Sequence, residues 1–157
     1  MRRVAWLAPI LPGLLASCGS VGTPSQPGLF FPTDPQQQSA GMDALFEGPL
    51  TVRDGCVMIG RPGNLSLAVW PKGFTADRDD SGRVVVRDEN GDVIATEGER
   101  FDMAGGYVAE FRPEEKVEPQ AQQIRRVEEW LGDEIPQRCL ASDVYGVWSV
   151  GETHPLT

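Results

Sequence analysis

The sequence predicts a mainly β fold, a small antiparallel β-barrel with one α-helix before its last strand. Six or seven short runs of β-branched, aliphatic and aromatic residues are separated by Gly, Pro, Asn-Gly and Asp-Gly turn signals. Only one segment has the apolar period of a helix, and it comes late in the chain. A single open sheet of that size would leave two edges unpaired, so a closed or partly closed barrel is favoured.

The first expected hairpin lies in LTVRDGCVMI, residues 50–59. Asp54 and Gly55 separate two β-prone runs, and an Asp-Gly pair in that position is the strongest short-range hairpin signal. The next strand is expected over residues 65–70, because Pro71 and Gly73 close it.

The second expected hairpin joins residues 84–86 to residues 93–96 through the Asn-Gly pair of DENGD. A longer strand is expected over residues 100–111, with a bulge or turn at Gly105-Gly106. A last strand is expected over residues 143–150.

The single helix is expected in EPQAQQIRRVEEWL, residues 118–131. Ile124, Val127 and Leu131 are three to four positions apart, which places them on one face, and Gly132 ends the helix. With the helix in this place, the barrel is similar to OB-like or SH3-like architectures. That likeness rests on strand count and implies no function.

The N-terminus has the layout of a secretory signal. Arg2 and Arg3 precede an apolar run over residues 4–16, and small residues precede Cys18. The run is shorter than the roughly 20 residues that a transmembrane helix requires, and two prolines interrupt it. We therefore expect residues 1–17 to be cleaved as a signal peptide.

Leu15-Ala16-Ser17-Cys18 resembles the lipobox of bacterial lipoprotein precursors. The resemblance covers the leader alone. It implies a thioether-linked diacylglycerol on Cys18, usually with a further acyl chain such as palmitate on its amine, and therefore an extracytoplasmic protein anchored to a bacterial membrane. The alternative is an ordinary signal peptide with a coincidental cysteine.

The mature chain divides into a tether and one domain. Residues 18–42 hold the lipidated cysteine and a flexible tether, because they are rich in Pro, Gly, Ser and Gln. Residues 43–157 form a single β-rich domain. Leu29-Phe30-Phe31 is an apolar spot in the tether, which could dock on the domain, lie at the lipid interface or bind a partner.

The charge of the mature chain bears on its partners. Loss of Arg2 and Arg3 from 14 basic residues leaves 12 against 23 acidic ones, a formal net charge of −11. Such a surface repels nucleic acid phosphates and anionic headgroups. We therefore expect no nucleic acid partner, and membrane contact through the N-terminal lipid alone.

Cys56 and Cys139 remain once Cys18 is assigned to the lipid. An even pair in an oxidising compartment predicts a disulfide bond. It would close a loop of about 84 residues, worth roughly 4–5 kcal/mol in the chain-entropy model. Catalytic or metal-binding use is the alternative, but no histidine lies near either cysteine in the sequence.

The acidic segment DRDDSGRVVVRD, residues 77–88, resembles the EF-hand calcium loop. Asp77, Asp79, Ser81 and Asp88 would be the side-chain ligands of a Ca²⁺ ion, at positions 1, 3, 5 and 12. Position 12 is normally glutamate, and the strand-like RVVVR replaces the second helix. The favoured interpretation is therefore a solvated acidic turn between two strands, with no cofactor.

The chemical inventory argues against most enzymes. His154 is the only histidine and lies near the C-terminus, which argues against Ser-His-Asp, Cys-His and multi-histidine metal sites. Catalysis by paired carboxylates remains open. Six aromatic residues could line a sugar- or peptide-binding groove but more often fill a core: Trp70, Phe74, Tyr107, Trp130, Tyr145 and Trp148.

Two functions follow from these observations. The favoured one is a lipid-anchored, non-catalytic binding or interaction module of the bacterial cell envelope, with an envelope protein or glycan as its partner. The alternative is an envelope hydrolase that uses paired carboxylates. Acidic residues inside an apolar cleft would favour the hydrolase, and an exposed aromatic patch or sheet edge would favour the binding module.

Overall fold

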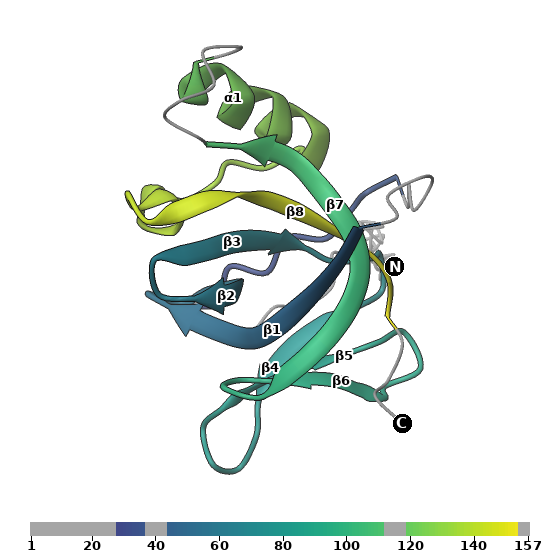
Figure 1. Cartoon of the computed structure of the whole chain (residues 1–157). Coiled ribbons are helices and arrows are strands. Elements are labelled where there is room, and N and C mark those ends of the chain that lie inside the picture. The colour runs from purple at the N-terminus through teal and green to yellow at the C-terminus, as the bar shows by residue number, and fades with distance from the viewer. Residues whose placement is uncertain (1–27, 37–43, 112–118, 154–157) are drawn as a thin grey trace, which may run out of the picture.

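The computed structural model describes residues 28–36, 44–111 and 119–153, and it confirms the predicted small β-barrel (Figure 1). The secondary structure consists of β1 (Ala44–Arg53), β2 (Cys56–Arg61), β3 (Asn64–Val69), β4 (Thr75–Arg78), β5 (Val84–Arg87), β6 (Val93–Thr96), β7 (Arg100–Glu110), helix α1 (Gln120–Leu131), the 3₁₀ helix η1 (Gln137–Leu140) and β8 (Val144–Thr153). In the described part of the chain, no helix is long and apolar enough to cross a membrane.

Five strands close the barrel in the order β1-β2-β3-β8-β7. β1, β2 and β3 form an antiparallel meander, and the chain returns by a long connection so that β7 lies beside β1. These four strands form a Greek key. β8 then enters between β7 and β3 and runs parallel to β3. A Greek-key barrel of five strands is OB-like, although the prediction from sequence did not include this parallel pair.

The β1–β2 hairpin forms where the Asp-Gly pair predicts it. Asp54 and Gly55 both have positive φ, at 51° and 77°, as a two-residue type I′ turn requires. The ladder then pairs Arg53 with Cys56 and Leu50 with Ile59. The turn therefore sets the register of the first two barrel strands.

β4, β5 and β6 form a second, three-stranded sheet inserted between β3 and β7. The predicted antiparallel pairing of residues 84–86 with residues 93–96 is present, with Val86 opposite Ala95. The sequence predicted these strands as part of the barrel, and it did not predict β4. They lie outside the barrel because, in the described residues, they form a ladder with one another and not with a barrel strand, and their buried residues, such as Val84 and Val86, pack against the barrel interior in one apolar cluster.

The barrel interior is filled by aromatic side chains from strands that are not neighbours. Phe46 of β1 lies 6.0 Å from Trp148 of β8 between ring centroids, although β7 separates the two strands. Trp70, at the end of β3, lies 6.2 Å from Phe101 of β7, although β8 lies between them. Such contacts can only cross the interior, and Trp70 is fully buried there.

A second apolar cluster lies on the outer surface of β2, β3 and β8, beneath α1 and η1. Val127 of α1 is buried, and Ile124 and Leu131 pack around the cluster as their spacing predicts. Gly132 ends the helix in the left-handed region with φ of 69°, and its N–H donates to Glu128 O at 2.8 Å. β2 and β3 are therefore covered on both faces.

The interruption expected at Gly105-Gly106 is a β-bulge within β7 and not a break. A Cβ atom on Gly105 would overlap the carbonyl oxygen of Ser149 and the indole Nε1 of Trp148. Only glycine lets β7 approach β8 this closely. The bulge therefore bends β7 around the barrel without ending its ladder.

Candidate functional site

Cys56 and Cys139 form the predicted disulfide bond, with their Cα atoms 5.6 Å apart. Both residues have no exposed surface. The bond joins the start of β2 to η1, immediately before β8, and so ties the α1–η1 segment to the barrel. The cysteine pair is therefore structural, and the catalytic and metal-binding alternatives for it are wrong.

Two polar contacts reinforce the same junction. Arg53, at the end of β1, donates a hydrogen bond to the carboxylate of Asp143 and forms an ion pair with it. This bond is the main reason that the pKa of Asp143 lies below its ordinary value. Arg138 of η1 donates to the carbonyl oxygen of Asp54 at 2.9 Å. All three links hold the chain before β8 against the β1–β2 hairpin.

The carboxylate of Asp79 stabilises the turn between β4 and β5. Its Oδ1 accepts hydrogen bonds from the Ser81 hydroxyl at 2.5 Å, the Ser81 N–H at 2.9 Å and the Arg83 N–H at 3.0 Å. The Ser81 hydroxyl contributes most to the lowered pKa of Asp79. Desolvation is the next largest effect and acts to raise the pKa, but the two N–H groups and the Arg83 charge add to the lowering. This carboxylate is the cap of a local turn.

Asp88 plays the same part in the β5–β6 turn. Its Oδ1 accepts from the N–H groups of Asn90 and Asp92, each at 2.9 Å. Burial acts to raise the pKa of Asp88, but these hydrogen bonds outweigh it and leave the pKa below its ordinary value. The two aspartates therefore cap turns at opposite ends of β5.

The four residues of the calcium-loop hypothesis do not come together. Asp79 lies across its turn from Arg83, and the five steps from Arg83 along β5 to Asp88 span about 16 Å at ~3.3 Å per residue. Asp77 lies on β4 opposite Val85, with Arg87 Nε 3.8 Å from its carboxylate. No group of three or more His, Cys, Asp or Glu side chains in the described residues could hold a metal ion. The arrangement is that of a solvated acidic turn.

The six aromatic residues are divided between the core and the surface. Trp70, Phe74 and Trp148 are buried in the interior cluster, while Trp130, Tyr107 and Tyr145 are half-buried. Tyr107 lies edge-on to Trp148 at 4.8 Å and to Tyr145 at 5.3 Å, and its hydroxyl is 3.3 Å from Ser66 Oγ. These residues extend the core toward the surface and do not line a groove in the described structure.

A cavity of about 270 Å³ lies at the β1–β7 pair, lined by Leu45, Glu47, Arg100, Phe101 and Asp102. Leu45 is 72% exposed, and Phe101 is buried. Arg100 donates to Glu47 at 2.5 Å across the two strands, and both side chains are more than half exposed. The lining therefore combines apolar surface with charges that remain in contact with water.

Two carboxylates face each other in this cavity. Glu47 and Asp102 are direct partners in the β1–β7 ladder. Like charges in that position are unfavourable, and Arg100 offsets part of the cost through its ion pair with Glu47. Asp102 Oδ1 is buried and accepts no hydrogen bond from the described residues. With two carboxylates and one guanidinium, the cavity favours a cationic group.

Sequence reasoning did not identify this cavity. Its residues come from 45–47 and 100–102, and no local pattern in either segment indicates that they pair. The alternation of polar and apolar residues along both strands is the one signal available, because it places Glu47 and Asp102 on the outer face. Cys18 and His154 lie outside the described residues.

No protein-family model, curated protein or solved structure matches this chain.

Proposed function

We propose that this protein is a lipid-anchored, non-catalytic binding module of the bacterial cell envelope, held on the extracytoplasmic side of a membrane by a lipid on Cys18. The lipobox-like leader supports the anchor. The Cys56–Cys139 disulfide agrees with an oxidising compartment.

The cavity at β1 and β7 is the observation that carries the binding role. Its volume of about 270 Å³ is just below the ~300–1,000 Å³ typical of small-molecule pockets, so it fits one side chain of a partner. Its two carboxylates outnumber its one guanidinium, which favours a lysine or arginine side chain. Phe101 is only 5% exposed and offers no open ring face to a sugar, so a protein partner is favoured over a glycan.

The hydrolase alternative has one specific observation in its favour. Cross-strand partners place their Cβ atoms about 4.5–5.5 Å apart, which allows their carboxyl groups to approach the separation of about 5–5.5 Å that retaining glycosidases have. Glu47 and Asp102 are such partners. However, the Glu47 side chain is 64% exposed and paired with Arg100, so the site does not exclude water as a hydrolytic cleft does.

The anchor is tested by metabolic labelling with a fatty acid in the native host. The native protein should take up label and enter the detergent phase, because two or more acyl chains give stable membrane binding. Cys18→Ser should remain an unlabelled precursor or soluble protein. Ser20→Ala, two positions away, is the matched control and should label like the native chain. An unlabelled native protein would contradict the proposal.

The binding site is tested by photo-crosslinking in cells, with a photoreactive amino acid at Leu45 or at Val93. Both side chains are exposed and apolar, at 72% and 50%, but only Leu45 lines the cavity. We expect a discrete crosslinked protein from position 45 that disappears in the Asp102→Lys background, and none from position 93. Equal crosslinking at both positions, or none at 45, would show that the cavity is not the binding site.

The hydrolase is tested with purified peptidoglycan and cell-wall polysaccharide as substrates. The binding module should release no more reducing ends than its Asp102→Asn variant does. Release by the native protein that is lost in both Glu47→Gln and Asp102→Asn would establish the alternative function.

A further inference from the structure

Residues 28–36, here called the strap, form part of the folded domain although their composition predicts a flexible tether. Four backbone hydrogen bonds attach them to β2 and to the end of β3: Phe30 N to Gly55 O at 2.7 Å, Val57 N to Phe30 O at 3.1 Å, Trp70 N to Pro32 O at 2.9 Å, and Asp34 N to Trp70 O at 2.7 Å. The strap therefore pairs with the barrel at both of its ends.

Side chains hold the strap as well. The ring of Phe31 stacks on Trp70 with centroids 5.4 Å apart and is 7% exposed. Asp34 is 4% exposed, and one of its carboxylate oxygens accepts from the N–H of Gln36 at 2.7 Å. Of the three roles left open for the apolar spot at residues 29–31, docking on the domain is the one that the structure has.

The strap begins directly against the β1–β2 turn. A Cβ atom on Gly55 would overlap the carbonyl oxygen of Gly28. The point where the chain leaves the domain toward Cys18 is therefore fixed beside this turn, on the β2–β3 side of the barrel. Figure 1 shows the strap passing behind the barrel, with β1 and β7 in front.

Docking of the strap shortens the connection to the lipid. Ten Cα steps separate Cys18 from Gly28, and fully extended they span at most about 35 Å at ~3.3–3.6 Å per residue. If the domain began at residue 43, the same arithmetic would allow about 85 Å. The connection is thus less than half as long as the composition predicts.

This length is short relative to the domain. A domain of about 120 residues has a radius of gyration near 14 Å, which corresponds to a sphere of about 17 Å radius and a half-circumference near 54 Å. A connection of at most about 35 Å cannot pass around that sphere, whereas one of about 85 Å can. The side of the domain opposite the strap therefore cannot reach the membrane that holds Cys18.

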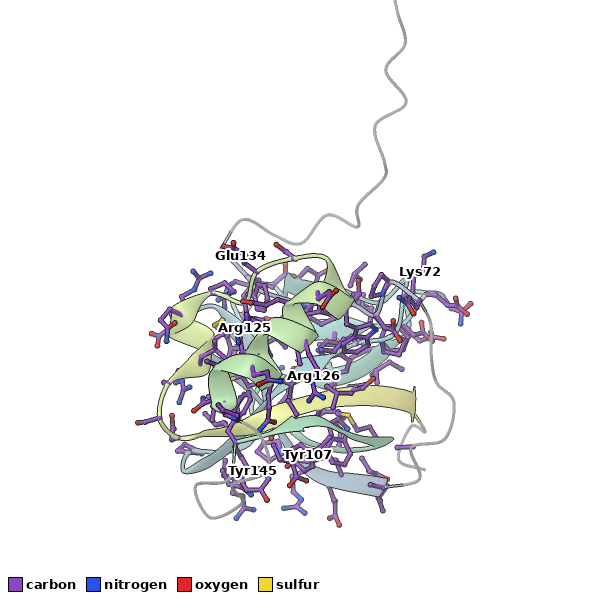
Figure 2. The ribbon with its side chains drawn as sticks, turned by 90° about the horizontal axis from the view of Figure 1, so that it is seen from above. Lys72, Tyr107, Arg125, Arg126, Glu134 and Tyr145 are labelled. Atoms are coloured by element: carbon purple, nitrogen blue, oxygen red, sulfur yellow. A yellow bond between two sulfur atoms is a disulfide. The ribbon has the colours of Figure 1, made fainter. Side chains whose placement is uncertain are left out.

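We infer that the docked strap orients the domain, with the β2–β3 side toward the lipid surface and the β1–β7 side, including its cavity, away from it. This inference rests on the proposed lipid anchor at Cys18. Figure 2, seen from above, shows Lys72 and Glu134 at the edge that corresponds to the back of Figure 1, and Tyr107 and Tyr145 at the opposite edge. The first pair faces the membrane and the second pair faces away from it.

The orientation also restricts the partner of the cavity. Leu45, Glu47 and Asp102 open on the side that the lipid cannot reach. The occupant of the cavity is therefore a soluble or projecting envelope protein and not a headgroup of the anchoring membrane. The net charge of −11 also argues against a headgroup as the occupant, because it disfavours close approach to anionic lipids.

The test uses the mature lipoprotein in nanodiscs that contain a gadolinium-chelating headgroup lipid. Relaxation enhancement of backbone amide signals should be severalfold larger at Asp54 and Lys72 than at Leu45 and Tyr107. Insertion of about fifteen Gly/Ser residues between Pro24 and Ser25 restores a reach of about 85 Å and should remove most of this difference. Identical nanodiscs without gadolinium give the baseline.

A second variant separates strap docking from tether length. Phe31→Ala combined with Asp34→Ala should release the strap and reduce the difference between the two sides, whereas Val93→Ala, an exposed position outside the strap and the cavity, is the control and should preserve it. Equal enhancement on both sides of the anchored native protein would overturn the inference and leave the lipid anchor intact. If native Cys18 carries no lipid, coupling its thiol to a maleimide headgroup lipid tests the geometry separately from the anchor.

Discussion

The β4–β6 sheet and the α1–η1 segment cover different parts of the barrel and are held in different ways. The sheet spans residues 75–96, and neighbouring strands pair through short turns capped by Asp79 and Asp88. The α1–η1 segment is held by a disulfide between residues 83 positions apart and an ion pair between residues 90 positions apart. The first region is assembled by local chemistry and the second by long-range links.

This difference predicts how each region responds to change. A region built from local turns loses only a small part of its unfolding free energy when one turn is altered. A region held by a few long-range links loses much more of its unfolding free energy when one link is removed, because each link closes a long loop.

Removing the disulfide should have the largest effect on stability. For a loop of about 84 residues the chain-entropy model gives about 4.5 kcal/mol, which corresponds to a fall in Tm of about 15 °C or more for a domain of this size. Cys56→Ala, Cys139→Ala and the double variant should lose nearly the same amount, because each lacks the same bond. Thermal unfolding measures all three.

Reduction of the native protein after partial unfolding is the control for the cavity that the alanines leave. It should lower Tm to a similar extent. A loss of less than about 1 kcal/mol in the double variant would show that the other contacts of the α1–η1 segment suffice without the bond.

Phe31→Ala should have the next largest effect, about 3 kcal/mol in urea unfolding. The substitution removes a buried ring stacked on Trp70, and Phe→Ala in a core costs about 3–5 kcal/mol. We expect the lower end of this range of about 3–5 kcal/mol because the strap lies at the edge of the interior apolar cluster. Val93→Ala, at an exposed position, should cost less than about 0.5 kcal/mol. Similar values for the two variants would mean that the strap is only loosely attached.

The local parts of the fold were predictable from the sequence. The Asp54-Gly55 turn, the pairing of residues 84–86 with 93–96, and the helix that ends at Gly132 all depend on signals within a few residues. Each involves a backbone conformation that few residue types adopt, and this makes the signal specific. The cysteine pair was predictable because only two cysteines remained.

The parts that were missed depend on distant partners. β4 has only one buried apolar residue, Ala76, and is a strand because β5 pairs with it. The strap has two prolines and only one short apolar run, Leu29-Phe30-Phe31, and it is ordered by Gly55 and Trp70, which lie far along the sequence. The cavity required the pairing of β1 with β7. In each case tertiary contact overrides the local composition.

Acid should weaken both regions, and the β4–β6 turns more. The pKa values of Asp79, Asp88 and Asp143 lie below the ordinary value in the folded protein, so the unfolded state binds more protons as the pH falls. Their contribution is present above about pH 4 and is lost as the pH falls through the folded pKa values. The urea midpoint should therefore fall as the pH is lowered below about 4, and not above it.

Two sets of variants assign this acid response. Asp79→Asn with Asp88→Asn should flatten the pH dependence more than Asp143→Asn does, because two of the three shifted carboxyl groups are in the turns. A larger flattening in Asp143→Asn would instead place the acid sensitivity at the junction held by Arg53.

Calcium should have the smallest effect, with the same Tm at millimolar Ca²⁺ as with a chelator at matched ionic strength. A site with an extracellular-type Kd of ~10⁻⁴ M would add about 1.4 kcal/mol at millimolar calcium, a shift of a few degrees. No shift is expected, because Asp79 Oδ1 already accepts hydrogen bonds from Ser81 and Arg83 and because Asp88 caps a different turn. Mg²⁺ at equal concentration is the control for general screening of the acidic surface. A calcium-specific rise in Tm that Asp79→Ala abolishes would mean that the two turns rearrange to share an ion, and the β4–β6 sheet would then depend on a bound ligand as the α1–η1 segment depends on its disulfide.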